Sequence, residues 1–261
     1  MLKMLSQRAA ILACLYSSVI LYAFEPVIIL VGPPGSGKGT FSQHMKDRYG
    51  YSHICIGDLL RYEIKQRTLL GIEIEETVRN GRYVDPKIVE ALLEKAISQC
   101  RMDRSSCILD GFGQNEGELD TIRHLLHEQG LLDRTFLLYL NSPDDMCEAR
   151  ILNRSVCSDC GHVYNGVAAQ PILDGVCDHC SHPLSTKIND TPGVVVNRLR
   201  HYRDRVQRYY EASLSVFPSL TFDSSGPLEE CQLFYDRLAR EVDTDSDAIS
   251  FVLRMTGRPL L

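Results

Sequence analysis

The sequence predicts an α/β fold in which helices cover both faces of a parallel β-sheet, and three observations support this prediction. From Pro26 onward, short β-branched runs alternate with helical stretches, a rhythm typical of parallel strands connected by helices. The first of these runs leads directly into a glycine-rich turn and then a helix. Hydrophobic residues make up 44% of the chain and charged residues 24%, which is an ordinary globular composition.

The expected elements can be placed in order along the chain. Val27–Val31 is rich in β-branched residues and predicts the first strand, and Lys38–Tyr49 is expected to form the helix after it. Proline favours the first turn of a helix, so helices are expected to begin at Pro143 and Pro192. Further buried strands are predicted at residues 106–109, 135–140 and 220–222.

Two segments interrupt the alternation of strands and helices. Residues 57–83 are helical in pattern without a strand, and residues 155–190 are rich in cysteine, glycine and proline. We interpret both as insertions that can move, so that a core domain at 26–242 carries one insertion at 56–85 and another at 155–190. Residues 243–261 form a C-terminal tail with a short apolar patch but no clear period, and no role is predicted for it.

The N-terminus has the pattern of a secretory leader. Lys3 and Arg8 precede an uncharged run at residues 9–24. A helix of that length, rising about 1.5 Å per residue, is shorter than the roughly 30 Å hydrocarbon core of a bilayer. Three interpretations stay open: a leader or weak membrane anchor, a start codon placed too far upstream, and an extra packed helix. Residues 1–25 are therefore left out of the fold prediction.

Charge and cysteine usage narrow the function classes. A net charge of −6 argues against a protein that coats itself with nucleic acid, because such binding needs many cations facing phosphates. Four of the ten cysteines fall into two Cys-x2-Cys pairs, which are more typical of metal ligation than of a secreted disulfide framework. We therefore expect a reducing compartment, the cytoplasm, while the N-terminal segment leaves export or membrane attachment open.

A phosphate-binding motif follows the first predicted strand. Its glycines let backbone N–H groups turn inward around a phosphate, the helix N-terminus adds partial positive charge, and Lys38 reaches the terminal phosphates. A dinucleotide-binding fingerprint fits less well, since it does not explain a lysine at the helix start. The motif reads Gly32-Pro33-Pro34-Gly35-Ser36-Gly37-Lys38-Gly39-Thr40, with the hydroxyl residue one position later than usual.

The two cysteine pairs have the spacing of a zinc ribbon. Cys157-x2-Cys160 and Cys177-x2-Cys180 are separated by 16 residues, within the range expected for four thiolates on one ion. Four protein thiolates leave no open position for water, so the predicted zinc is structural. Two disulfides at the same positions are the alternative. His162, His179 and His182 are nearby competing ligands, but the thiolates alone complete a tetrahedral set.

This variant of the phosphate loop, followed by a zinc ribbon, resembles the adenylate kinase family of nucleoside monophosphate kinases with a zinc-bearing lid, and the resemblance runs from Val27 to about Val242. It implies a P-loop core of three α/β/α layers, with a helical arm for the nucleoside monophosphate and a zinc-ribbon lid that closes. It also implies reversible phosphoryl transfer from ATP to AMP with Mg²⁺, carried out by a monomer.

The resemblance assigns roles on the ATP side of the site. Lys38 and Arg154 are expected to contact phosphates as catalytic residues, and Arg150 to stack on the adenine. Asp58 and the catalytic Asp110 are expected to orient water molecules on magnesium. The ATP-binding residues implied in this way are Gly35, Ser36, Gly37, Lys38, Gly39, Thr40, Arg150, Arg154, Val163, Tyr164 and Gly226.

On the acceptor side, the resemblance implies that Arg61 grips the acceptor phosphate, while Lys187 and Arg198 neutralise charge during transfer, so that all three are catalytic. The expected AMP-binding residues are Ile56, Arg61, Arg82, Tyr83, Val84, Gly111, Phe112, Gly113, Gln114, Glu118, Lys187 and Arg198.

The departures from the family pattern cluster on this acceptor side. Gln114 stands where the family has a phosphate-binding arginine, Ile56 replaces a hydroxyl residue, and Lys187 replaces an arginine whose planar fork binds phosphate in a bidentate way. A catalytically weak nucleotide-binding relative is therefore an alternative. Glu118 replaces a glutamine, and its carboxylate suits a base rich in N–H groups such as guanine, unless it is only a solvated surface residue. A P-loop protein whose ribbon touches nucleic acid is disfavoured, because residues 155–190 carry few cations.

Overall fold

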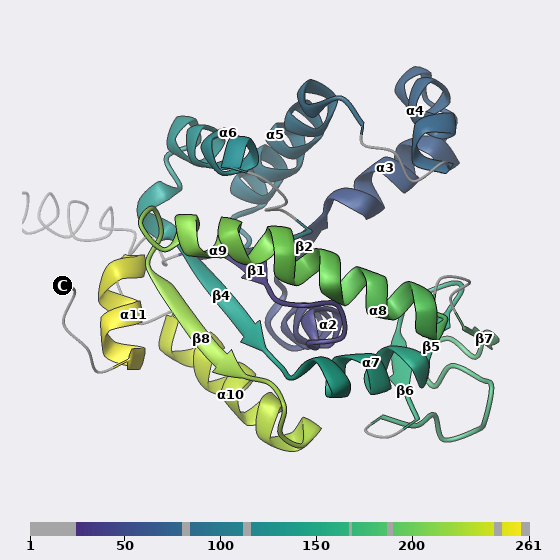
Figure 1. Ribbon diagram of the computed structural model, residues 1–261. Helices are drawn as coiled ribbons and strands as arrows, with labels where there is room; N and C mark the ends of the chain where they lie inside the picture. Colours follow the sequence, from purple (N-terminus) through teal and green to yellow (C-terminus); the bar gives the residue numbers. More distant parts are fainter. Residues whose placement is uncertain are drawn as a thin grey trace, which may run out of the picture.

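The computed structural model describes residues 25–79, 84–111, 116–166, 169–186, 190–242 and 247–256. Within these residues, a parallel sheet has the strand order β2-β3-β1-β4-β8 (Figure 1). The α/β prediction is confirmed, and each predicted strand is present. The strands are β1 Val27–Val31, β2 Ser52–Cys55, β3 Cys107–Asp110, β4 Thr135–Asn141 and β8 Ser219–Asp223, of which β2 was not predicted.

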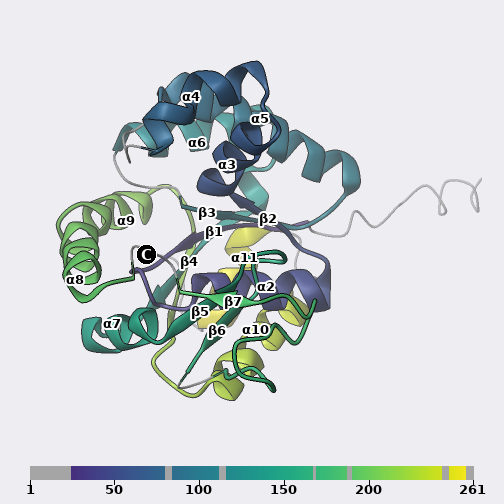
Figure 2. The ribbon, with the colours of Figure 1, turned by 90° about the vertical axis from the view of Figure 1, so that its right-hand side faces the viewer.

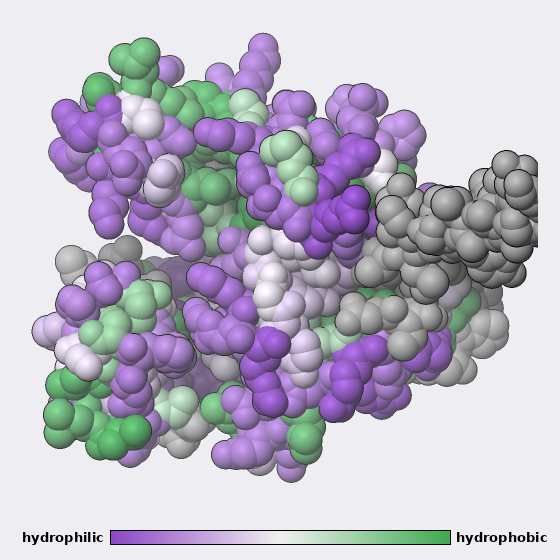
Figure 3. Space-filling model, turned by 180° about the vertical axis from the view of Figure 1, so that it is seen from behind, coloured by the Kyte–Doolittle hydropathy of each residue, from purple (hydrophilic) through white to green (hydrophobic). Residues whose placement is uncertain are grey.

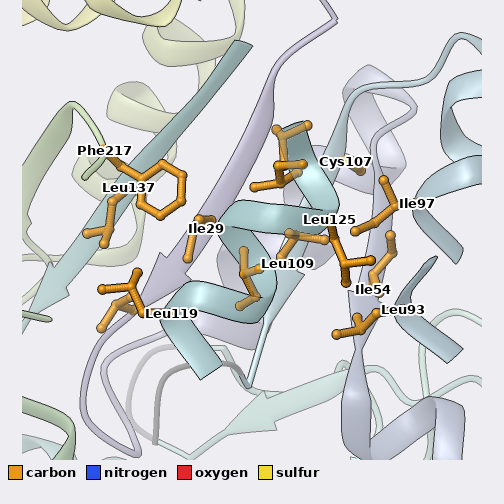
Figure 4. Close-up of a cluster of buried hydrophobic side chains, with 14 of the residues drawn as sticks. Ile29, Ile54, Leu93, Ile97, Cys107, Leu109, Leu119, Leu125, Leu137 and Phe217 are labelled. Carbon is orange, nitrogen blue, oxygen red and sulfur yellow. The ribbon is translucent and has the colours of Figure 1, made fainter. Parts of the chain in front are cut away.

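Helices cover both faces of the sheet and form three layers with it (Figures 1 and 2). Successive residues of a strand point to opposite faces, so Val27 and Ile29 enter one core cluster while Ile28 and Leu30 enter the other. The first cluster packs the sheet against α5 Pro86–Asp103, α6 Glu116–Glu128 and α9 Gln207–Ser213 (Figure 4). The second packs it against α2 Lys38–Tyr49, α10 Leu228–Val242 and α11 Ala248–Thr256.

The predicted helices at Pro143 and Pro192 are also present. They are α7 Asp144–Leu152 and α8 Pro192–His201, and they pack together through a small buried cluster that includes Ile151 and Val195. After α8 the chain continues through a π-helical turn, Tyr202–Val206, into α9, and a short 3₁₀ turn, Leu132–Arg134, precedes β4. No helix of the described residues is long and apolar enough to cross a membrane.

Both interrupting segments protrude from this core. The first holds α3 Ile56–Lys65 and α4 Leu69–Arg79, here called the helical arm, and the second holds β5 Arg154–Cys157, β6 Val163–Asn165 and β7 Leu184–Ser185, here called the cysteine ribbon (Figure 1). The described strands of the cysteine ribbon form an antiparallel sheet in the order β6-β5-β7. In the arm, Gly71 lets α4 approach α3 closely, because a Cβ there would collide with the carbonyl of Glu63.

Helix α11 lies in the segment for which no element was predicted. Its side chains at Ala248, Phe251 and Val252 are buried in the second core cluster, and Met255 packs at its margin. These positions recur at the spacing of one helical face, so the short apolar patch is the buried side of a helix. Phe251 contacts Phe136 of β4 with ring centroids 4.9 Å apart.

This packing predicts that α11 is part of the folded core. Phe251→Ala removes a fully buried ring, and we expect it to lower the free energy of unfolding by about 3–5 kcal/mol. Urea denaturation measures the change. The control is Ile249→Ala on the same helix, whose side chain is 46% exposed and whose loss should change stability by no more than about 0.5 kcal/mol. Equal effects of the two changes would show that α11 does not pack as described.

Candidate active site

The phosphate loop connects β1 to α2, as predicted, and its glycines are required by the backbone. Gly35 and Gly37 have φ values of +87° and +95°, which favour glycine. A Cβ at Gly35 would also lie only 2.9 Å from the Cα of Cys147 in α7. By contrast, a Cβ at Gly39 would meet no atom within 4 Å, so this position faces open space at the start of α2. The loop thus leaves room beside the helix N-terminus, where an anion binds favourably.

Lys38 folds back over the loop. Its ammonium donates hydrogen bonds to the carbonyl oxygens of Gly32 at 2.7 Å and Pro33 at 3.0 Å. Burial lowers the pKa of Lys38, Asp110 and Cys147 oppose this shift, and Arg198 adds to it. Asp110 at the end of β3 and Arg198 of α8 thus lie close enough to the phosphate loop to influence the pKa of Lys38.

The cations expected beside the donor phosphates are held by an aspartate that the sequence analysis did not single out. Asp190, with a side chain only 3% exposed, accepts hydrogen bonds from Arg154 Nε at 3.0 Å and Nη2 at 2.8 Å. Arg198 Nη1 lies 3.5 Å from the same carboxylate. Burial and the neighbouring Arg154 lower the pKa of Arg198, and Asp190 opposes that shift. The two arginines therefore converge on one anion.

Arg150 is fixed by residues near the ends of β4 and β8, including the loop at residues 224–227, here called the late loop. Its guanidinium donates to the carbonyl oxygen of Ser224 at 2.8 Å and to Ser142 Oγ at 3.3 Å. Ser224 Oγ in turn donates to the carbonyl oxygen of Ser36 at 2.9 Å, which ties the late loop to the phosphate loop. Gly226 follows in that late loop, and a Cβ there would lie 3.2 Å from Glu230 Oε2.

The two carboxylates expected to orient magnesium waters lie at the carboxyl end of β3 and in the helical arm. Asp110 ends β3, and its Oδ2 lies 3.4 Å from Nε2 of His53, a histidine for which no partner was predicted. In α3, Arg61 pairs with Asp58, and both side chains are about two-thirds exposed. Figure 3 shows the surface hollowed between the arm and the part of the molecule below it, on the left of that view.

Two predicted acceptor residues have surroundings that the sequence did not reveal. Ile56, the departure from a hydroxyl residue, packs against the first core cluster. Glu118 lies in α6 close enough to the buried Tyr209 to raise its pKa, although burial of Tyr209 is the larger cause. Gly111 is exposed with φ +85°, and Val84 is half-buried just before α5. The predicted residues Arg82, Tyr83, Phe112, Gly113, Gln114 and Lys187 lie outside the described residues.

The four ribbon cysteines come together as predicted. Their sulfur atoms lie within 4.8 Å of one another, with 3.3 Å between Cys157 and Cys180 and 3.6 Å between Cys160 and Cys177. These are free thiols, since the separations exceed the roughly 2.05 Å of a disulfide bond. Burial disfavours the thiolate of Cys177, but hydrogen bonds from Tyr164 and from backbone N–H groups outweigh it and lower its pKa to about 6. The cluster is compatible with one metal ion.

Tyr164 belongs to this cluster. It is 4% exposed, its hydroxyl lies 3.5 Å from Cys177 Sγ, and that hydroxyl accepts a hydrogen bond from the backbone N–H of Asp178 at 2.7 Å. Its side chain therefore faces the sulfur atoms, whereas the neighbouring Val163 is half-buried in β6.

A glycine-rich loop at the carboxyl edge of a parallel sheet, faced by arginines at the base of an inserted ribbon, places this chain among the P-loop proteins that handle nucleotide phosphates. The sequence pattern of the adenylate kinase family matches residues 30–213. The chain therefore belongs to the adenylate kinase family.

Individual relatives agree with this assignment. The adenylate kinase of Pyrococcus abyssi is 35% identical over 204 residues, covering 78% of this chain and 90% of that protein. That of Thermococcus kodakarensis is 32% identical over 207 residues, covering 78% and 89%. That of Hydrogenobaculum sp. is 31% identical over 195 residues, covering 73% and 90%.

The position of Asp190 leads to a stability prediction. Asp190→Asn removes the charge that Arg154 and Arg198 share, and we expect the free energy of unfolding to fall by about 1.5–3 kcal/mol, the contribution typical of hydrogen bonds to charged groups. Urea unfolding checks this. Asp204→Asn, at an exposed position beyond α8, is the matched control and should leave the midpoint unchanged. An unchanged midpoint for Asp190→Asn would contradict the described ion pairs.

Proposed function

We propose that this chain catalyses reversible phosphoryl transfer from ATP to AMP, giving two molecules of ADP. The observation that carries the proposal is the pairing of Arg154 and Arg198 with the buried Asp190 in an adenylate kinase family member. Arg198 and Asp110 also lie close enough to Lys38 of the phosphate loop to influence its pKa. Transfer of a phosphoryl group needs little covalent help from the protein. It needs aligned reactants and cations that match the charge on the moving group.

On the donor side, we assign the ATP phosphates to the backbone of residues 35–40 and to Lys38. Arg150, held by Ser224, lies at the late loop, and this supports adenine binding between its guanidinium and the backbone at Gly226. Arg154 is assigned to the donor phosphates. Because the Tyr164 side chain is engaged with Cys177, we assign to Tyr164 and Val163 only contacts through their backbone.

Asp190 suggests how the cations are kept in place before the nucleotide arrives. Its carboxylate binds Arg154 through two oxygen atoms, a geometry that phosphate oxygens reproduce. We propose that Arg154 and Arg198 exchange contacts with Asp190 for contacts with the transferring phosphoryl group. Asp190 is thus a positioning residue, which holds the two guanidinium groups together at little entropic cost.

Magnesium, when bound with ATP, neutralises phosphate charge. Asp110 fits the role of holding its water ligands, because this largely buried carboxylate lies beside the phosphate-loop lysine. Asp58 is exposed and paired with Arg61, so Asp58 can orient water on magnesium only after the helical arm moves.

For the acceptor, we assign AMP to the space between the helical arm and the sheet edge. Arg61 and Arg198 are proposed to contact its phosphate together with Lys187, and Gly111 and Val84 to line its base with Arg82, Tyr83, Phe112, Gly113, Gln114 and Glu118. The arm at 56–85 and the ribbon at 155–190 are proposed to close over the two nucleotides. Ile56 stands where the family has a hydroxyl residue, and its packing on the apolar core supports a structural role for the isoleucine.

The ribbon is proposed to hold a structural zinc ion through Cys157, Cys160, Cys177 and Cys180. The sulfur separations of 3.3 and 3.6 Å approach the spacing of about 3.8 Å that four Zn–S bonds of about 2.3 Å give in a tetrahedron.

The free thiols of the ribbon also support the proposal that the protein resides in a reducing compartment, the cytoplasm. A monomeric state is part of the same proposal.

The proposed turnover is tested with matched arginine variants of α8. Arg198→Ala removes a cation beside Lys38, and we expect kcat for ADP formation from ATP and AMP to fall on the order of 10³-fold. Arg200→Ala, at an exposed position two residues later, should retain wild-type turnover. A coupled assay of ADP measures both. Similar rates for the two variants would contradict the assignment of Arg198.

The same assay with AMP, GMP, CMP and UMP identifies the acceptor. AMP is expected to be the best substrate, whereas preference for GMP would favour the Glu118 hypothesis. If no acceptor is turned over until Gln114→Arg is introduced, the wild-type chain is a nucleotide-binding relative rather than a kinase.

The zinc proposal has its own test. Removing the ion with a strong chelator should release at least one equivalent of zinc and make residues 155–190 sensitive to protease, because the ribbon is too small to fold on its own core. Metal analysis and limited proteolysis measure the two effects. Release of no zinc from the purified protein, or unchanged protease resistance after release, would contradict a structural ion.

A further inference from the structure

Two histidines of the cysteine ribbon are not used by the four-thiolate cluster. His162 follows Cys160 by two residues, and His179 lies between Cys177 and Cys180, so each ring is carried by one of the two cysteine turns. The ring centroids are 4.6 Å apart. The backbone at His162 is fixed, because the carbonyl oxygen of His162 accepts a hydrogen bond of 2.9 Å from the N–H of Cys157. The ribbon therefore holds two imidazoles side by side.

A carboxylate from the core faces these imidazoles. Asp47 lies in α2, the helix that begins at the phosphate loop, and the ribbon lies in front of that helix in Figure 2. Gln43 Nε2 donates to both oxygens of Asp47, at 2.8 and 2.9 Å, which orients the carboxylate. One ligand atom each of Asp47, His162 and His179 all lie within 4.8 Å of one another. Within the described residues, no hydrogen bond or ion pair joins Asp47 to either ring.

We infer that Asp47, His162 and His179 bind a divalent transition-metal ion such as Zn²⁺, separate from the ion of the four cysteines. Two imidazole nitrogens and one carboxylate oxygen are ligands that such ions prefer, and three protein ligands leave a position for water. Ligand atoms on one ion with bonds of about 2.0–2.1 Å lie about 3.3 Å apart. Closing the remaining distance is a small movement, because Asp47 and His179 are exposed and His162 is half-buried.

The ligands come from two parts of the molecule, which distinguishes this site from the four-thiolate cluster. An ion held by Asp47 and the two histidines ties the cysteine ribbon to α2. A second group, Asp159, Cys180 and His182, also has ligand atoms within 4.8 Å of one another, but it lies within the ribbon and shares Cys180 with the four-thiolate cluster. That shared thiolate makes it the weaker candidate for an additional ion.

The test counts ions bound by the full chain after its first equivalent of zinc is loaded. Titration with Zn²⁺ by calorimetry, together with metal analysis, should detect a second equivalent. Asp47→Ala should raise the dissociation constant of the second ion at least about tenfold. Loss of a residue that only hydrogen-bonds to a metal ligand already lowers metal affinity about tenfold, and Asp47 is proposed to be a ligand itself. The first ion should be retained, since Asp47 is remote in sequence from the ribbon. Asp159→Ala is the matched control and should leave both ions bound.

His179→Gln provides a second variant, and it should weaken the second ion in the same way while the first equivalent is still counted. Binding of only one ion by the wild-type chain would overturn the inference. So would unchanged binding of the second ion by Asp47→Ala, or its loss in Asp159→Ala, which would place the ion within the ribbon instead.

Discussion

The close packing of the phosphate loop against α7 is the constraint on which the rest of the site depends. Only glycine fits at position 35, because a side chain there would meet the backbone of Cys147. This contact sets the loop directly on the helix that carries Arg150 and leads into Arg154 at the start of the ribbon. The backbone to which we assign the phosphates and the helix that leads to Arg150 and Arg154 are thereby held together by one close contact.

A second constraint is the balance of charge around that loop. Arg198 lowers the pKa of Lys38, and the lowered pKa of Arg198 reflects both its burial and the neighbouring Arg154. Asp190 opposes the lowering of the Arg198 pKa from a nearly fully buried position, and Asp110 acts in the same direction on Lys38. The fold therefore supports a cluster of cations before nucleotide binds, which is the arrangement that a site organised for phosphoryl transfer requires.

The sequence predicted most of the elements that position the site, and the failures have physical causes. The bounds of β1 and α2 agree with the structure because a β-branched run, a glycine cluster and a helical stretch follow one another without interruption. Strand β2 was missed because only Ile54 of its four residues is fully buried, so it shows no apolar run. Asp190 was missed because an isolated aspartate carries no spacing signal. Its role arises only when β5 and α8 are brought together.

The departures from the expected family pattern fall on the proposed acceptor side of the site. On the proposed donor side, Lys38, Arg150 and Arg154 match the expected pattern, and each of them donates a hydrogen bond to a neighbouring residue. On the acceptor side, Ile56 is packed into the apolar core, and Glu118 influences the buried Tyr209. Ile56 therefore contributes to the packing of the core, and Glu118 lies near it. Because the proposed donor and acceptor halves rest on different elements, the acceptor half can diverge while the residues assigned to the donor phosphates are retained.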